Sequence, residues 1–187
     1  MAVTAAGDEP SVLIVDDEER VANTYELRLR DGYETSVVHG GEEALDVVDD
    51  SFDVVLLDRR MPGTPGDEVL GEIRQRGLDC RVVMLTAVDP GFDVAEMDVD
   101  DYVVKPVDKD RLRNVVDRAL TISEYNEQMQ RLSSLKLKRN VLEVEMDRHR
   151  LEENPTYVEL VEEIDALEAE IEAMEETLDL DQVDLYL

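Results

Sequence analysis

Four apolar runs of this sequence each end in polar side chains of a kind that takes part in phosphoryl transfer. The clearest run is Val54–Leu57, which is followed directly by Asp58. Four consecutive apolar residues, two of them β-branched, are typical of a strand buried on both faces of a parallel sheet. The Pro and Gly residues of segment 62–66 prevent this strand from continuing. The polar residues that follow the four runs are Asp16 and Asp17, Asp58, Thr86, and Lys105.

These side chains suit one site because parallel strands end along the edge where open α/β sheets bind ligands. Carboxylates gathered there would raise one another's pKa unless a cation lay between them. Carboxylate, backbone carbonyl and water oxygens suit Mg²⁺, which keeps some of its waters and accepts phosphate oxygens. The hydroxyl of Thr86 and the ammonium of Lys105 could bind the remaining oxygens of a phosphoryl group. The set predicts a phosphoryl-transfer site in which positioning and charge neutralisation supply the catalysis.

The wider pattern predicts five strand–helix units in alternation. Each apolar run is followed by residues at helical spacing, and Asp108 could cap the last helix. The fourth unit is the weakest, because segment 89–98 offers only Phe92, Val94, Ala95 and Met97 for burial. Alternation of this kind predicts an α/β fold, namely a five-stranded doubly wound parallel sheet with helices on both faces. The strands are expected at residues 12–15, 35–38, 54–57, 81–85 and 102–104.

The C-terminal third predicts an α-helical hairpin. No Gly or Pro occurs in residues 107–154, so the last helix of the sheet domain is expected to run on unbroken. Asn154 and Pro155 then suit the N-cap and first position of a second helix. Its apolar residues recur at alternating steps of three and four from Tyr157 to Leu178, which is typical of a coiled-coil seam. A short connection favours an antiparallel hairpin, and an intermolecular coiled coil is the alternative.

The charge pattern supports this hairpin. Residues 131–150 carry six basic and three acidic residues, whereas residues 151–187 carry fourteen acidic residues and no Lys or Arg. A basic helix beside an acidic one can form exposed ion pairs, each contributing about 0.2–1 kcal/mol.

Composition indicates an acidic intracellular protein. The 187 residues carry 48 Asp and Glu against 19 Lys and Arg, a formal net charge of −29. Such a surface, poor in Lys, suits a high-salt cytoplasm in which salt screens self-repulsion. The single Cys80 excludes an intramolecular disulfide and is expected to be buried where a strand begins. Without a long apolar segment, we expect a cytoplasmic protein with no membrane partner, beginning with a flexible leader at residues 1–10.

The sheet domain closely resembles the receiver domain of two-component response regulators. The resemblance rests on four ordered motifs, VLIVDDE (12–18), LDRRMPG (57–63), LTA (85–87) and DDYVVKP (100–106). It implies a flavodoxin-like receiver domain over residues 11–120. In such a domain Asp58, as nucleophile, takes the phosphoryl group from a phosphohistidine of a sensor histidine kinase. The domain would catalyse only its own phosphorylation and slow dephosphorylation, so no enzyme acting on a separate substrate is expected.

The resemblance also implies a metal site at the strand ends. Asp17 and Asp58 would bind Mg²⁺ directly, and Asp16 would act mainly through water. The backbone carbonyl of Arg60 would be a further ligand, while its side chain is expected to be solvated.

The same resemblance implies a switch. Lys105 would bind one phosphoryl oxygen, Thr86 would move to hydrogen-bond another, and Tyr102 would turn inward behind it. The sequence departs from the family here, since Asp98 stands where a Gly is usual and the interval from Thr86 to Lys105 is short. The fourth helix is therefore expected to be truncated, which puts the usual receiver dimer face in doubt.

Residues 121–187 resemble the HalX domain that follows receivers in halophilic archaea. This family is suspected of transcriptional regulation, although the sequence contains no helix-turn-helix or zinc pattern. Nucleic-acid contacts, if made, would fall on Arg131, Lys136, Lys138 and Arg139. The adjacent acidic segment and the salt sensitivity of phosphate contacts favour instead a protein–protein output, through a homodimer or the transcription machinery.

Two other functions stay open. The chain could be a coiled-coil adaptor that works without phosphorylation. It could also be a Mg²⁺-dependent phosphohydrolase of small molecules, but that chemistry would need an acid–base carboxylate two residues after Asp58, where Arg60 stands.

Overall fold

The computed structural model describes residues 9–87 and 92–184 of the chain. These form two compact units that divide between Leu120 and Thr121. The flexible leader expected at residues 1–10 lies outside the described residues, apart from its last two positions.

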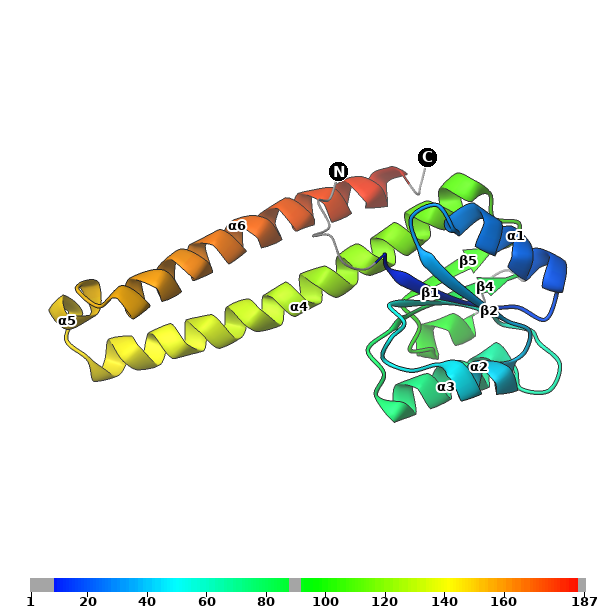
Figure 1. Cartoon of the computed structure of the whole chain (residues 1–187), viewed down its shortest axis with the longest axis horizontal. Helices are drawn as coiled ribbons and strands as arrows, with labels where there is room; N and C mark the ends of the chain where they lie inside the picture. The colour runs from blue at the N-terminus through cyan, green and yellow to red at the C-terminus, as the bar shows by residue number, and fades with distance from the viewer. Residues whose placement is uncertain (1–8, 88–91, 185–187) are drawn as a thin grey trace. The chain divides into compact units, whose positions relative to one another are not determined.

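The first unit is built on one sheet of five parallel strands in the order β2-β1-β3-β4-β5. Figure 1 draws these strands as arrows and labels β1, β2, β4 and β5. The central strand β3 is buried at every position, as its unbroken apolar run predicts. Its register aligns Leu57 with Val15 of β1, so the residues that follow these two strands emerge side by side. The strands are β1 (Ser11–Val15), β2 (Glu34–Val38), β3 (Val54–Asp58), β4 (Arg81–Thr86) and β5 (Asp101–Val104).

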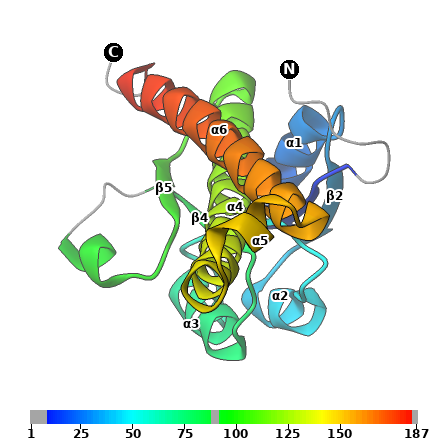
Figure 2. The same ribbon diagram turned by 90° about the vertical axis from the view of Figure 1, so that its left-hand side faces the viewer.

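Helices cover both faces of this sheet, so the predicted doubly wound α/β fold is confirmed. Alternate residues of β1 point to opposite faces. Ile14 packs in one core with α1 (Glu19–Leu29) and the first turns of α4 (Lys109–Glu145). Leu13 packs in the other core with α2 (Gly41–Val47) and α3 (Gly66–Arg76). Figure 2 shows α2 and α3 lying side by side on this second face.

The fourth crossover differs from the others. In place of an α-helix over residues 89–98, the structure has a 3₁₀ helix, η1 (Phe92–Glu96), and residues 88–91 lie outside the described part. Of the apolar residues expected to be buried there, Phe92 is 99% exposed, Ala95 is exposed, and only Val94 and Met97 are half-buried. So little buried apolar surface cannot hold a full amphipathic helix, and the expected truncation is confirmed.

The second unit holds the rest of α4, a short helix α5 (Arg148–Glu152) and α6 (Pro155–Asp184). As expected, α4 runs unbroken from the sheet domain into the C-terminal region, but it ends at Glu145 and not at Asn154. Asp147 takes an extended conformation and its carbonyl accepts the N–H groups of Arg150 and Leu151, which starts a new helix. The new helix buries Leu151, which is only 4% exposed. Burial of this side chain offsets the free energy lost by interrupting α4.

The start of α6 agrees with the sequence. Pro155 is its first residue, and the side-chain oxygen of Asn154 accepts the backbone N–H of Thr156 at 2.9 Å. This bond satisfies one of the free donors at the helix N-terminus.

The two long helices form the predicted antiparallel hairpin. Tyr125 of α4 donates its hydroxyl to Glu175 of α6, whereas Tyr157 at the start of α6 donates to Glu143 near the end of α4. Residue numbers thus rise along one helix as they fall along the other. The buried residues between the helices come from both of them, namely Leu132, Leu135, Ile164, Leu167 and Ile171.

The predicted charge pairing between these helices is confirmed. Arg131 lies 2.5 Å from Glu163, and Lys136 lies 2.5 Å from Glu168. Both pairs are partly exposed, so each stabilises the hairpin by about 0.2–1 kcal/mol at most. Among the helices of the described residues, none is long and apolar enough to cross a membrane.

Replacing Ile164 by Ala should destabilise the hairpin by about 2–5 kcal/mol, because a fully buried side chain would leave a cavity between the helices. The measurement is chemical unfolding followed by circular dichroism in concentrated KCl. Val158→Ala on the same helix is the control, since Val158 is 40% exposed, and it should change stability by less than about 0.5 kcal/mol. Equal losses in the two variants would contradict this account of the hairpin core.

Candidate functional site

The carboxyl ends of four strands bring the predicted site residues together. Asp16 follows β1, Asp58 ends β3, Thr86 ends β4 and Lys105 follows β5. Three of them are buried polar side chains, since Asp16 is 2% exposed, Asp58 is 7% exposed and Thr86 is 1% exposed. Burying a polar group costs free energy unless it has a hydrogen-bond or ionic partner. The partners of these side chains therefore show how the site is stabilised.

A single ammonium group joins the two buried carboxylates. The Nζ atom of Lys105 lies 2.6 Å from Oδ2 of Asp16 and 2.5 Å from Oδ1 of Asp58. The backbone of Lys105 is held as well, because its N–H donates to the carbonyl of Thr86 at 2.6 Å. Lys105, which follows β5, therefore contacts residues at the ends of β1, β3 and β4.

The second oxygen of each carboxylate accepts a nearby backbone N–H. The N–H of Arg60 donates to Oδ2 of Asp58 at 2.7 Å, and that of Glu18 donates to Oδ1 of Asp16 at 3.0 Å. Each carboxylate is thus fixed between a side-chain cation and a backbone amide, which limits its rotation.

The electrostatics of the pair follow from burial and charge. Burial raises the pKa of Asp58, and the charge of Asp16 adds to this, while hydrogen bonding and attraction to Lys105 oppose it. For Lys105, burial alone would lower the pKa, but the two carboxylates outweigh it and the pKa is raised. Two carboxylates against one ammonium leave net negative charge when all are ionised, so the site can attract a further cation.

The donor set fits Mg²⁺ in its chemistry. Mg²⁺ is commonly held by one or two carboxylates, with waters and phosphate oxygens completing its coordination, and Asp16 and Asp58 supply two such carboxylates side by side. Asp17 is half-buried next to them. Within the described part of the chain, no group of three or more His, Cys, Asp or Glu side chains is close enough to form a complete cage. An ion here would therefore depend on water and backbone oxygens as well.

Tyr102 is linked to the end of strand β3 by a residue that the sequence patterns did not single out. Nη1 of Arg59 donates to the hydroxyl of Tyr102 at 3.3 Å, and its Nε donates to Asp67 in the first turn of α3 at 3.0 Å. The only sequence signal for Arg59 is its place directly after Asp58. The half-buried Tyr102 is thus held by the neighbour of the predicted nucleophile.

Gly66 lets helix α3 begin directly against the end of β3. A Cβ atom at this position would lie 2.3 Å from the carbonyl oxygen of Asp58, and the N–H of Gly66 donates to the carbonyl of Arg59 at 3.0 Å. Any side chain here would push the backbone of Asp58 out of place. In the sequence this residue is visible only as a helix and strand breaker.

The side chains of the remaining predicted residues do not contact the two carboxylates. The side chain of Arg60 is exposed, as expected. The four basic residues considered for nucleic-acid contact lie on α4 in the second unit, where Arg131 and Lys136 are paired with acids of α6. Their role in binding stays a prediction, as does that of Lys138 and Arg139.

Comparison with known families identifies the class of protein. The model of the response regulator receiver domain matches residues 12–117, and that of the HalX domain matches residues 121–185. The chain therefore belongs to the response regulator receiver family and carries a HalX domain after its receiver.

A curated relative from Haloferax volcanii, described as "Putative transcriptional regulator", is 43% identical over 167 residues. The match covers 88% of this chain and 28% of the relative, so the chain spans little more than a quarter of that protein's length.

Among solved structures, the response regulator TrrA from Thermotoga maritima, in complex with Mg²⁺ and BeF, is 36% identical with a TM-score of 0.54. The match covers 59% of this chain and 99% of TrrA. The receiver domain of a Francisella response regulator is 28% identical with a TM-score of 0.54, covering 59% of this chain and 96% of that one. A receiver domain from Vibrio parahaemolyticus, 24% identical with a TM-score of 0.59, covers 64% and 95% and shows the fold alone.

Replacing Lys105 by Met should leave two buried carboxylates without their cation and raise the pKa of Asp58 further. A carboxyl group whose pKa is higher in the folded than in the unfolded state favours folding when protonated. The variant should therefore lose about 3 kcal/mol of stability near neutral pH and regain it as the pH falls through the folded pKa.

Unfolding midpoints across a pH series, in KCl with a chelator present, measure this effect. Lys109→Met is the matched control, because Lys109 is half exposed and lies 3.9 Å from Asp31. Parallel pH profiles for the two variants would show that Lys105 does not neutralise the pair.

Proposed function

We propose that this protein is a phosphorylation switch in which Asp58 accepts a phosphoryl group from a phosphohistidine of a sensor histidine kinase. The observation that carries the proposal is the buried contact of Lys105 with both Asp16 and Asp58, at 2.6 and 2.5 Å. A carboxylate that can act as a nucleophile then lies beside a cation that can neutralise incoming phosphate charge, which supports the proposal. Membership of the receiver family supports the same conclusion.

The proposed transfer is a displacement at phosphorus. An oxygen of Asp58 forms the new P–O bond as the P–N bond to the donor imidazole breaks, and the imidazole leaves with the electron pair of that bond. The backbone N–H of Arg60 keeps the carboxylate oriented before attack. Lys105 then exchanges its contact with a carboxylate oxygen for one with a phosphoryl oxygen, so its positive charge stays within the site.

Mg²⁺ held by Asp16, Asp17, Asp58 and the backbone carbonyl of Arg60 would supply further positive charge to the phosphoryl oxygens. The presence of Mg²⁺ and BeF in the complex of the Thermotoga maritima relative supports this assignment.

The switch follows from the two groups next to the nucleophile. Thr86 is buried at the end of β4, from where its hydroxyl would move to hydrogen-bond a phosphoryl oxygen. Tyr102 would turn inward behind it, which requires loss or rearrangement of its hydrogen bond with Arg59. We infer that this rearrangement changes the state of the HalX domain.

For the output, we favour control of transcription through a protein partner. The description of the Haloferax volcanii relative supports a role in transcription. Direct binding of nucleic acid by α4 is less favoured, because Arg131 and Lys136 are already neutralised by Glu163 and Glu168. The phosphohydrolase alternative is not favoured either, since the exposed Arg60 stands where an acid–base carboxylate would be needed.

Incubation with acetyl phosphate and Mg²⁺ should add one phosphoryl group to the folded wild-type protein and none to Asp58→Asn. Intact mass spectrometry in concentrated KCl measures the adduct, which should be sensitive to hydroxylamine because it is an acyl phosphate. The exposed Asp79→Asn variant is the control and should be modified like the wild type. Removing Mg²⁺ with a chelator should abolish the adduct.

An adduct on Asp58→Asn would contradict the assignment of the nucleophile. So would failure of the folded wild type to react with acetyl phosphate and with a phosphorylated histidine kinase alike.

Phosphorylation should also change backbone protection in the second unit if the receiver controls it. Hydrogen exchange of residues 121–184, compared with and without the phosphoryl group, should differ in the wild type and stay unchanged in Asp58→Asn. Identical exchange in both states of the wild type would show that phosphorylation of the receiver does not change the HalX domain.

A further inference from the structure

The last turns of α4 carry apolar side chains that the hairpin does not use. Leu137 is 65% exposed, Val141 is 54% exposed and Val144 is 82% exposed. Their spacing of four and then three residues places them on one face of the helix, which we name the outer stripe. Large apolar residues at such a spacing on an exposed face mark an interaction surface.

The outer stripe faces away from α6. Val141 follows the buried Leu132 by nine residues, and Val144 follows the buried Leu135 by the same interval. Nine residues make about two and a half helical turns, which places each pair on opposite sides of the helix. Packing within the hairpin therefore does not account for the outer stripe.

We propose that the outer stripe binds the same stripe of a second copy of this chain, with the two α4 helices antiparallel. An isologous contact of this kind needs a surface that is complementary to itself. The outer stripe is complementary to itself, because its centre is apolar and the charged residues along its side, Lys138 and Glu145, have opposite sign.

The local net charge makes this part of the hairpin the best suited to self-association. The chain as a whole has a formal charge of −29, and residues 151–187 carry fourteen acidic residues without a basic one. Residues 133–147, which contain the stripe, carry three basic and three acidic residues, so their charges cancel. A second acidic copy can approach this segment without the repulsion that the face of α6 would impose.

The flank of the stripe specifies the antiparallel orientation. Lys138 and Glu145 are seven residues apart and so lie on the same side of the stripe. In an antiparallel pair related by a twofold axis, the same flank of each helix faces its equivalent. Lys138 of each copy then lies opposite Glu145 of the other, which gives two symmetric ion pairs.

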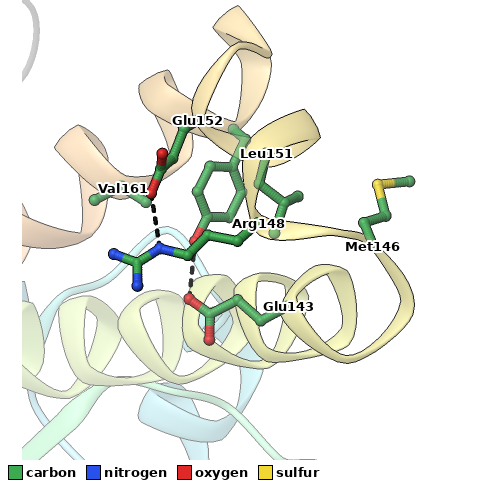
Figure 3. A pocket seen from close by; sticks show the side chains of 7 residues that line it. Glu143, Met146, Arg148, Leu151, Glu152 and Val161 are labelled. Carbon is green, nitrogen blue, oxygen red and sulfur yellow. Dashed lines mark hydrogen bonds and ion pairs between the residues drawn. The ribbon is translucent and has the colours of Figure 1, made fainter.

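Hydrogen bonds near the end of α4, where the hairpin turns, favour this contact. Figure 3 shows the hollow of about 430 Å³ beside the end of α4, where two hydrogen bonds join its lining residues. Arg148 donates to Glu152 at 2.8 Å, and the hydroxyl of Tyr157 donates to Glu143 at 2.8 Å. The bond from Tyr157 joins the end of α4 to α6 before association, which lowers the entropy cost of ordering the stripe on binding.

The size of the stripe predicts a weak association. Stable dimers bury about 1,200–2,000 Å² in total, and three side chains from each copy supply only part of that area. Concentrated salt strengthens the contact, because it screens the net charge of the two copies and, for strongly hydrated anions, favours apolar burial.

Sedimentation of the full chain in concentrated KCl tests the proposal. We expect a monomer–dimer equilibrium in the wild type and at least a tenfold weaker association in Val144→Gln, which removes an exposed apolar group without touching the hairpin core. Val158→Gln on α6 is the matched control and should associate like the wild type, since Val158 is exposed but lies outside the stripe. A monomer at all concentrations, or equal association of both variants, would overturn the proposal.

Cysteine cross-linking tests the orientation. Lys138→Cys and Glu145→Cys should form a disulfide-linked dimer when mixed and oxidised, and little when oxidised separately. Each residue lies about 10 Å along the axis from its own equivalent in the antiparallel pair, which is too far for a disulfide. The native Cys80 does not interfere, because it is buried and burial raises its pKa to about 11. Efficient cross-linking of Lys138→Cys alone would place Lys138 opposite its own equivalent, and no cross-link in the mixture would show another orientation. Either result would overturn the proposal.

Discussion

The contact of one ammonium with two buried carboxylates is the interaction on which the candidate site depends. Asp16 and Asp58 emerge side by side because β1 and β3 are paired in register, and their charges would repel if nothing lay between them. Lys105 resolves this repulsion while joining the end of β5 to the centre of the sheet. The same lysine neutralises the two carboxylates and, in the function that we propose, would neutralise a phosphoryl group, so folding stability and the proposed function share one interaction.

Much of the fold and site could be predicted because both follow from short-range patterns. Residues 54–57 are apolar at every position, so a strand buried on both faces was the simplest interpretation. The polar residues after four such runs meet in space because parallel strands end along one edge. The hairpin followed from heptad spacing in α6 and from opposite charge on the two helices, which the pairs of Arg131 and Lys136 bear out.

What escaped prediction depends on tertiary contacts that leave no local pattern. The break at Met146 and Asp147 has no Gly or Pro to mark it, and burial of Leu151 against the hairpin decides it instead. Phe92 was one of the few apolar residues that a helix over residues 89–98 could bury, yet the 3₁₀ helix found there is too short to form an apolar face and leaves it exposed. The role of Arg59 left no local pattern beyond its place after Asp58, because Asp67 and Tyr102, which it contacts, lie 8 and 43 residues away.

The strand order also gives the two sides of the site different local stability. Asp58 ends the central strand β3, which is hydrogen-bonded on both sides, whereas Tyr102 and Lys105 belong to or follow β5, an edge strand bonded only to β4. An edge strand of four residues can open locally at far lower free energy than the strand at the centre of the sheet. The proposed nucleophile Asp58 and the hydroxyl of Thr86 thus lie on strands that are paired on both sides, whereas Tyr102 and Lys105 lie at the edge of the sheet, which opens more readily.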